Sequence, residues 1–564
     1  MTENENSMNE KEVNEVIEIR KEKITKLLKG KEWIYYVILA VIVYISVYIR
    51  TRNIPRLKDI STNTWTLGPD LDPFLFLRWA EYIVEHGKLF VIDNMRYVPL
   101  GHDTGLEKKF LSYLIAWFHN IFSTFSGEQS IIYSAIIFPV FMFALTCIAF
   151  FFLVRKVFYE SFEDKNIPNI IALISTLFLA IIPTILPRTI AGIPEKEAAG
   201  FLFIFLSLYF FICFFKSKDY QSLIIYSLLS GLAIVALSYT WGGATFVYLV
   251  IGLSVFIMFV LGNIKKKELL GISILTAVIV ILTIFFSPQF SAKSHLINFL
   301  TSTFTIPLFA SLLFIVFNIF AYPKLKTLKI CKILNDKYHL PQEVISIIFV
   351  LIMMIIASIP IVGINFIPNK LNGLMDSFIR PLAVDRFLMT VAENKQPSYV
   401  EEWKGSFGPN GFSIGSKSIS TPPLFFSLFF LGSIILFYTL IKKFEKSDKI
   451  LLTMAYTISV IGLIFSKYSP SSKLNGVSSE SIIFYFGGMA IFIGCSIYML
   501  YKYNKSNKKE LLNFESGHII VFTLFFISIL AARSGVRFVM VLVPAASILA
   551  GYFIISLFLM ANQQ

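Results

Sequence analysis

The feature that most limits the fold of this chain is its repeated apolar runs, each about as long as a membrane-crossing helix. A helix of about 20 residues spans a hydrocarbon core of roughly 30 Å, and only helices or closed barrels satisfy every backbone amide there. We therefore predict an all-α polytopic membrane protein with about 12–14 helices. The fourteen runs lie near residues 33–50, 131–154, 169–187, 198–215, 221–239, 243–262, 269–286, 298–321, 344–362, 423–441, 450–466, 482–501, 517–532 and 536–559.

The composition of the chain excludes several other classes of protein. Apolar residues make up 56% of the chain and charged residues 15%, whereas a soluble domain has about 25% charged residues. A soluble enzyme, a disordered chain and a collagen are therefore excluded. The four cysteines have no spacing typical of a metal site or a disulfide framework; they are Cys147, Cys213, Cys331 and Cys495.

Most of the formal net charge of +14 lies in alternate connections between the apolar runs. Residues 1–32 are highly charged and have no apolar core, which predicts a cytoplasmic tail and no cleavable signal peptide. The positive-inside rule then explains the basic loops, so we expect contacts with membrane lipid and no nucleic-acid partner. The loops expected in the cytoplasm contain Arg155, Lys156, Lys165, Lys216, Lys218, Lys265, Lys266, Lys267, Lys324, Lys326, Lys329, Lys332, Lys442, Lys443, Lys446, Lys449, Lys502, Lys505, Lys508 and Lys509.

Two connections on the opposite, extracytoplasmic side are much longer than the rest, and they cover residues 51–130 and 363–422. Loops longer than about 15 residues in a compact protein are usually functional or disordered. The even number of predicted helices places the end of the chain in the cytoplasm. Carboxylates on the extracytoplasmic side are therefore the candidates for chemistry.

The first acidic group lies in the segment GPDLDPFLFLRWAEYIVEHG, which contains Asp70 and Asp72. Asp72 precedes Pro73, a pattern typical of an N-cap followed by proline at the first helical position. The helix that follows is amphipathic, so we expect it to lie in the membrane interface. Asp72 either caps this helix only or also supplies a carboxylate to a site.

The second acidic group is RTIAGIPEKE, from Arg188 to Glu197, in a short external turn that enters a helix. Glu195 and Glu197 can face one hard cation if the turn is tight, with Asp72 as a third ligand from another loop. Mg²⁺ and Mn²⁺ prefer such oxygen ligands. The alternative is a solvated turn whose acids stabilise the helix N-terminus.

Two further motifs carry candidate residues. The segment TVAENKQP in loop 363–422 contains Thr390 and Glu393, which could equally belong to an ordinary polar loop. Arg537 begins the last apolar run, within the segment ARSGVRF. An arginine there can extend its charged end to the lipid headgroups or hold a phosphate with two hydrogen bonds.

Taken together, these motifs resemble the STT3/AglB/PglB family, the catalytic subunits of asparagine-linked oligosaccharyltransferases. Asp72 matches the metal-ligand position of the family's first acidic motif. Glu195 and Glu197 match the acid-x-acid pair of the second motif, and Glu195 stands where many members carry aspartate. TVAE resembles the family's external-loop motif with Glu393 as its glutamate, and Arg537 matches an arginine directed at the lipid-linked pyrophosphate.

The resemblance implies a GT-C-type glycosyltransferase transmembrane domain over residues 33–564. It implies that an oligosaccharide moves, with inversion, from a polyprenyl phosphate or pyrophosphate to the side-chain amide of asparagine in an Asn-x-Ser/Thr sequon. Asp72 and Glu393 would bind the amide, Mn²⁺ or Mg²⁺ would be held by Asp72, Glu195 and Glu197, and Arg537 with Arg188 would bind the leaving phosphate. Thr390 is assigned to substrate binding. The family also implies a prokaryotic, archaeal-type cell membrane, with the active site on its extracytoplasmic face.

One family feature is missing from this sequence. Members carry a globular external domain with a WWDYG motif that recognises the sequon, and no such string occurs before Gln564. We therefore expect a membrane part without its C-terminal domain, either truncated or naturally short. Two alternatives remain open: a polyprenyl-phosphate-dependent transferase that acts on a hydroxyl group, and a non-enzyme such as a transporter or an inactive relic.

Overall fold

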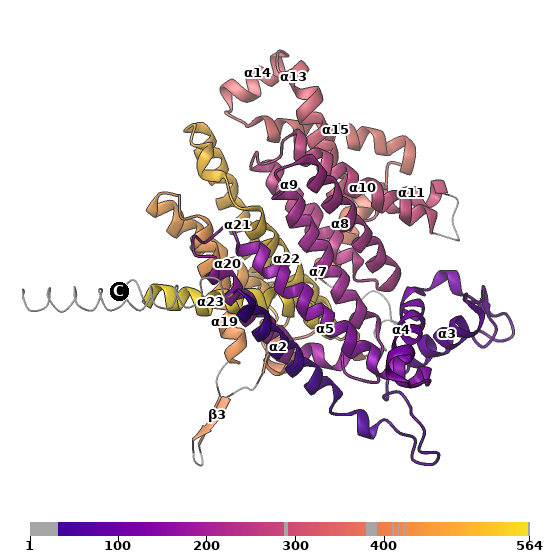
Figure 1. Cartoon of the computed structure of the whole chain (residues 1–564). Helices are drawn as coiled ribbons and strands as arrows, with labels where there is room; N and C mark the ends of the chain where they lie inside the picture. Colours follow the sequence, from indigo (N-terminus) through magenta and orange to yellow (C-terminus); the bar gives the residue numbers. More distant parts are fainter. Residues whose placement is uncertain are drawn as a thin grey trace, which may run out of the picture.

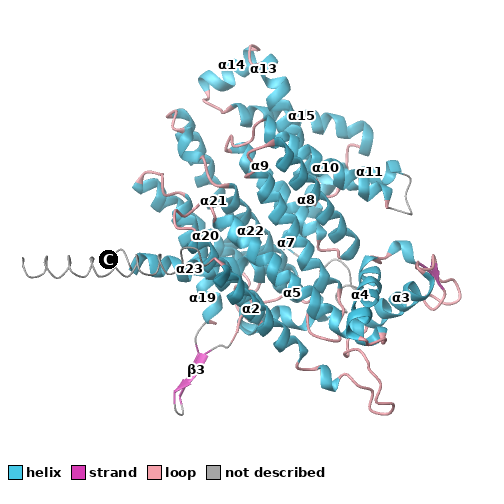
Figure 2. Ribbon diagram, in the orientation of Figure 1, coloured by secondary structure: helices cyan, strands magenta, loops and turns pink. Residues whose placement is uncertain are grey.

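The computed structural model describes residues 32–286, 292–379, 392–408, 411–414, 417–420 and 423–561. Within these residues the chain is a bundle of long helices, and the connections between them contain short helices and strands (Figures 1 and 2). Strands occur in the described residues only as two small antiparallel pairs. The predicted tail, apart from Glu32, and Thr390 lie outside the described residues.

Eleven helical segments in the described residues are long and apolar enough to cross a membrane. Three shorter apolar helices accompany them, and the combined set coincides with the fourteen predicted runs, which confirms the all-α membrane architecture. The longer segments are built on α2 (Trp33–Thr51), α5 (Ile131–Phe158), α7 (Lys196–Phe215), α8 (Tyr220–Thr240), α10 (Lys266–Phe285), α12 (Ile306–Val316), α15 (Gln342–Val362), α20 (Lys446–Phe465), α21 (Ser479–Lys505), α22 (Ser516–Ser534) and α23 (Val539–Ala561). The shorter ones are α6 (Asn166–Ile181), α9 (Ala244–Val260) and α19 (Leu424–Leu440). The chain is therefore an integral, multi-pass membrane protein.

Helix α23 lies inside the bundle, against α6, α19 and α22. Two glycines permit these close contacts, as small residues do between membrane helices. A Cβ atom on Gly432 of α19 would collide with the carbonyl of Leu549, and one on Gly551 of α23 would collide with Ser175 of α6. The middle of α23 is thereby held close to both α6 and α19.

The first long external connection folds into a small unit of its own. Its helices α3 (Asp72–His86) and α4 (Phe110–Ser126) pack together, and the strands β1 (Ile92–Asp93) and β2 (His102–Asp103) pair beside them. The buried carboxylate of Asp93 accepts hydrogen bonds from the guanidinium of Arg78 and from Trp79 Nε1, the latter at 3.0 Å. This ion pair links the strand pair to α3.

The second long connection contributes only short elements to the described structure, and Figure 1 shows one of them, β3, at the lower edge of the molecule. They are α16 (Phe366–Ile379), η6 (Ala392–Asn394), η7 (Tyr399–Trp403), α18 (Lys404–Ser406), β3 (Gly411–Ile414) and β4 (Lys417–Ser420). The helices α13 (Tyr322–Leu325) and α14 (Lys329–Lys332) lie at the opposite end. The remaining short elements are η1 (Ile54–Arg56), η2 (Thr104–Leu106), η3 (Pro183–Arg188), α11 (Ala292–Thr301), η4 (Phe317–Ala321), η5 (Ile333–Lys337), η8 (Lys509–Leu512) and η9 (Val536–Phe538).

Candidate functional site

Arg188 lies at the centre of a group of carboxylates contributed by three distant parts of the chain. Its Nη1 atom is 3.1 Å from Asp70 Oδ2 and 3.1 Å from Glu195 Oε1. Its Nη2 atom forms an ion pair with Glu393. The structure therefore brings the three acidic motifs of the sequence to one guanidinium.

Backbone hydrogen bonds explain why the first two acidic motifs lie side by side. The amide of Gly68 donates to the carbonyl of Gly192 at 2.8 Å. Gly68 precedes Asp70 by two residues, and Gly192 precedes Glu195 by three. Gly192 has φ = 84°, a left-handed conformation that favours glycine, and a Cβ atom there would collide with Leu57. The glycine in the RTIAGIPEKE motif is thus required for this turn.

A fully buried arginine supports the same turn from within the bundle. Arg50, near the end of α2, donates from Nε to Thr189 Oγ1 at 2.8 Å and from Nη1 to the carbonyl of Ala180 at 2.8 Å. Its backbone carbonyl accepts from Ala191 at 3.0 Å, and its guanidinium stacks on Phe143 at 3.7 Å. These contacts hold the residues that follow Arg188 in place.

Glu195 immediately precedes α7 and is almost completely buried, with 4% of its surface exposed. Burial, together with the negative charges of Glu197, Asp70 and Asp72, raises the pKa of its carboxyl to about 8, although the positive charge of Arg188 opposes the shift. Four carboxylates thus lie close enough to repel one another electrostatically. A cation placed among them would relieve this repulsion.

The prediction that Asp72 caps a helix is wrong by one position. Helix α3 begins at Asp72 itself, and Leu71 occupies the N-cap position. Leu71 already has helical angles of φ −84° and ψ −42°, whereas a capping side chain needs an extended backbone to reach the free amides. The exposed carboxylate of Asp72 is consequently not used by the helix terminus, and its charge acts on Glu195.

The oxygen atoms gathered here are of the kind that a hard divalent cation binds. Asp72, Glu195 and Glu197 come from the starts of α3 and α7, and the charges of Asp72 and Glu197 both act on Glu195. In the described residues, no three acidic, histidine or cysteine side chains converge closely enough to hold a metal ion. The positive charge among the acids is instead supplied by Arg188. The carboxylate oxygens are therefore of the chemical kind that a divalent cation binds, although the described side chains are not close enough together to hold one.

The segment that carries Glu393 is attached to the bundle by backbone hydrogen bonds on both sides. Val536 donates to the carbonyl of Lys395 at 2.9 Å, which connects the segment to η9 and Arg537. Tyr399 and Val400 donate to the carbonyls of Lys467 and Tyr468, each at 3.0 Å. Arg537 itself is exposed, and its charge acts on Glu197. Arg537 thus lies near enough to the acidic residues to interact with them electrostatically.

Lys467 contributes a buried cation to this attachment. Its Nζ atom donates to Gln396 Oε1 at 2.6 Å, and only 9% of the residue is exposed. Burial lowers the pKa of Lys467 to about 7, and the nearby positive charge of Arg533 contributes to the shift. The segment that follows Glu393 therefore packs against a lysine that changes its charge near neutral pH.

Thermal stability is expected to rise with pH between about 7 and 10.5 through Lys467. The folded-state pKa is about 7 and the ordinary value is 10.5, so in this window the unfolded chain binds the proton and the folded chain does not. Unfolding then takes up a proton, and stability increases with pH. The measurement is the unfolding temperature of the purified protein at pH 6.5 and 9. Lys467→Gln should show a smaller increase than the wild type, whereas the exposed control Lys473→Gln should match it; equal slopes for all three would contradict the assignment.

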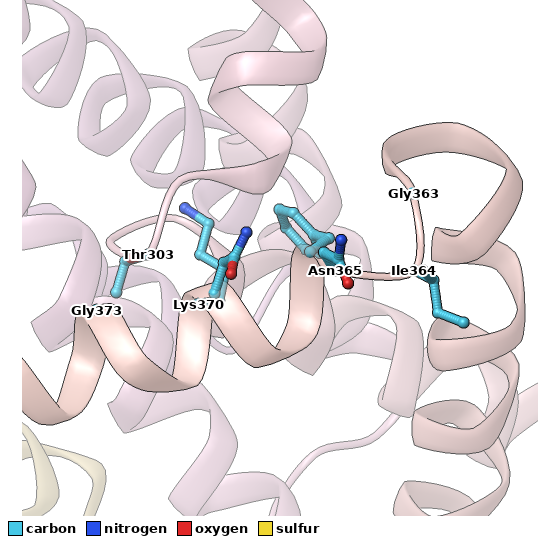
Figure 3. A pocket seen from close by; sticks show the side chains of 8 residues that line it. Thr303, Gly363, Ile364, Asn365, Lys370 and Gly373 are labelled. Atoms are coloured by element: carbon cyan, nitrogen blue, oxygen red, sulfur yellow. The ribbon is translucent and has the colours of Figure 1, made fainter.

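A cavity of about 750 Å³ lies elsewhere on the molecule, where α16 approaches the loop before α12. Figure 3 shows the side chain of Lys370 rising from α16 toward the loop that carries Thr303, while Ile364 points the other way. Its lining includes Asn365 and Asn369 but none of the carboxylates around Arg188. The cavity is therefore separate from the acidic site.

Sequence reasoning missed the roles of two residues in this site. Asp70 lies in the first motif, and the sequence predicts no functional role for it. In the structure it contacts Arg188 as closely as Glu195 does. Lys467 is one of few lysines in the short loops expected outside the cytoplasm, and this scarcity is the signal that could have singled it out.

A comparison with protein families gives a match over the part of the chain that contains the first two acidic motifs. Residues 33–383 match the family model described as "Oligosaccharyl transferase STT3, N-terminal". The chain belongs to the STT3 family. A comparison with curated proteins gave no significant match.

Solved structures with the STT3 fold include the oligosaccharyltransferase AglB of the archaeon Archaeoglobus fulgidus. The AglB complex with an inhibitory peptide and a dolichol-phosphate is 18% identical, with a TM-score of 0.57 over 94% of this chain and 51% of that chain. The apo form is 16% identical, with a TM-score of 0.57 and coverage of 94% and 51%. The form tethered to a peptide with the NVT sequon is 16% identical, with a TM-score of 0.54 and coverage of 94% and 50%. The chain spans about half the length of these structures and shares their fold.

Proposed function

We propose that this STT3-family chain is the catalytic membrane part of an asparagine-linked oligosaccharyltransferase. The observation that carries the proposal is the convergence of Asp70, Glu195 and Glu393, from three separate motifs, on Arg188. The donor would be an oligosaccharide on a polyprenyl or dolichyl phosphate or pyrophosphate. The acceptor would be asparagine in an Asn-x-Ser/Thr sequon. Structures that share this fold hold a dolichol-phosphate and a peptide with the NVT sequon, which supports both classes of substrate.

In the proposed reaction, the amide nitrogen of asparagine forms a bond to the anomeric carbon of the sugar. The bond from that carbon to the lipid phosphate oxygen breaks with its electrons on that oxygen, the amide passes one proton to the departing phosphate or to water, and the configuration inverts. An amide is a poor nucleophile because its lone pair is delocalised. Asp72 and Glu393 would accept hydrogen bonds from the amide N–H groups and rotate them out of conjugation. The exposure of both carboxylates leaves them accessible to a peptide.

The charge on the leaving phosphate needs a positive partner. Arg537 is exposed and lies beside the segment that carries Glu393, which suits this role. Arg188 is already paired with three carboxylates, so it would reach the phosphate only by releasing one of them. A divalent cation bound by Asp72, Glu195 and Glu197 would neutralise negative charge and orient the acids. We place this site on the extracytoplasmic face of an archaeal-type cell membrane.

Chelation of divalent cations is expected to lower transfer by at least about 100-fold, since the acids then lack their neutralising partner. The assay is transfer of a radiolabelled lipid-linked oligosaccharide to a sequon peptide, with EDTA and after return of Mn²⁺ or Mg²⁺. Return of either ion should restore the product. Transfer that is unaffected by EDTA would contradict the proposed metal site.

The same assay separates the alternative functions. Transfer to a peptide with serine or threonine but no asparagine would indicate an enzyme that acts on hydroxyl groups. Metal-dependent donor binding without any product would indicate a catalytic membrane part that needs a separate acceptor-binding domain. Absence of both donor binding and product would favour a transporter or an inactive relic.

A further inference from the structure

A second polar cavity lies at the opposite end of the molecule from the acidic site. It has a volume of about 620 Å³ and is lined by residues of the segment 322–336, the start of α15, Asn504 near the end of α21 and Lys509 of η8. Figure 1 shows α13 and α14, which belong to this segment, far from α3. Membrane-crossing segments end at Leu325 and Lys505, and another begins at Gln342. The cavity therefore lies at the depth where lipid headgroups meet the protein.

The charge around this cavity is positive. Lys326, Lys332 and Lys509 line it, opposed by one acid, Asp336. None of these three lysines forms an ion pair with a carboxylate in the described part of the chain. Three unneutralised ammonium groups around one concavity attract an anion.

One wall of the cavity is fixed by contacts with the bundle. The side chain of Asn504, near the end of α21, donates from Nδ2 to the carbonyl of His339. Cys331 is buried with Tyr322 and Ile345 in a small apolar cluster. Lys332 is therefore attached to a packed element and not to a free loop.

The same segment exposes apolar side chains beside its lysines. Leu328, Ile330 and Ile333 are 46%, 56% and 42% exposed. Exposed aliphatic groups next to basic residues are typical of segments that lie in the membrane interface, where the aliphatic groups contact acyl chains. This arrangement favours a lipid over a soluble anion as the ligand.

We propose that the cavity lined by Lys326, Lys332 and Lys509 binds the phosphate of an anionic phospholipid, whose acyl chains lie against Leu328, Ile330 and Ile333. The recognised group is a phosphate, which a soluble phosphate compound could also supply. The site is on the face of the membrane opposite to the acidic site, and its occupancy does not depend on transfer. It would anchor the α13–α14 connection to the leaflet that carries negative lipids.

The test is lipid binding by the full chain in neutral detergent, measured by native mass spectrometry with dioleoylphosphatidylglycerol and dioleoylphosphatidylcholine. The triple variant Lys326→Gln/Lys332→Gln/Lys509→Gln should lose affinity for phosphatidylglycerol by at least about tenfold, since one lysine near a charged surface contributes about fivefold. The control is Lys266→Gln/Lys442→Gln/Lys443→Gln, which removes the same charge from exposed lysines outside the cavity. It should bind like the wild type.

Two further measurements distinguish the source of the phosphate. Glycerol phosphate at millimolar concentration should compete weakly, and Ile330→Ser/Ile333→Ser should weaken the lipid without affecting the soluble compound. Equal binding of glycerol phosphate and lipid, lost in the cavity variant, would support a phosphate site with a soluble ligand. An unchanged affinity in the cavity variant, or equal losses in both triple variants, would overturn the proposal. Since no readout uses oligosaccharide transfer, these outcomes are independent of the proposed enzyme activity.

Discussion

Glu393→Gln is expected to lower transfer to a sequon peptide by about 1,000-fold or more, in the range that removal of an essential acid–base or charge-stabilising group costs. Glutamine keeps the size of the side chain but offers only one acceptor oxygen and no negative charge. The acceptor amide would therefore stay conjugated. The variant also loses the ion pair with Arg188. The measurement is single-turnover transfer from a radiolabelled donor, with donor binding measured separately.

Glu401→Gln is the matched control for this experiment. Glu401 lies on the same external segment, is partly exposed and forms an ion pair with Lys395. The control should retain most of the wild-type rate, since Glu401 pairs with Lys395, whereas Arg188 pairs with Asp70, Glu195 and Glu393. If Glu393→Gln also retained more than a tenth of the activity, Glu393 would not activate the amide, and transfer to a hydroxyl acceptor would be favoured.

Arg188→Ala is expected to destabilise the protein as well as to stop transfer. Removal of the guanidinium leaves the buried carboxyl of Glu195 without its positive partner, and breaking a buried ion pair costs about 3–5 kcal/mol. Because the pKa of Glu195 is already about 8, this carboxyl can take up a proton at pH 7. The loss of folding free energy at pH 7 should therefore be toward the lower end of this range. The measurement is the unfolding temperature at pH 6 and pH 9.

The pH dependence of this variant has a defined sign. Without Arg188 the pKa of Glu195 rises further, since a positive charge that opposes the shift is removed. Ionisation of the buried carboxyl then becomes more costly, so the loss of stability should be larger at pH 9 than at pH 6. Arg188→Lys should restore part of the stability, and Arg52→Ala, an exposed arginine near the same end, should have little effect. A deficit that does not change with pH would contradict the role assigned to Glu195.

The helices could be predicted from the sequence because hydrocarbon leaves the backbone no alternative to helix over an apolar run of sufficient length. The external regions are different. The contact of Arg188 with Glu393 joins residues 205 positions apart, and no local pattern encodes it. The motifs identified the acids, but Asp70 and Lys467 acquire their roles only from contacts between loops.

The one-position error at Asp72 has a similar cause. The sequence pattern Asp-Pro is compatible with the aspartate outside the helix or in its first turn. The choice depends on the backbone of Leu71, which follows Asp70 and its contact with Arg188. The Asp-Pro pattern alone therefore does not determine on which side of the helix boundary the aspartate lies.

The position of α23 between helices that precede it in the chain has a consequence for biosynthesis. The ribosome delivers α6 and α19 to the membrane before α23, yet α23 fills the space between them. In a nascent chain, the surfaces of α6 and α19 that contact α23 therefore stay uncovered until this helix inserts. Only then does Arg537 come near the acidic residues of the earlier segments. Assembly of the site is thereby delayed until the last described helix is in place. A translocation factor that covers the exposed surfaces of α6 and α19 would have its greatest effect before α23 inserts.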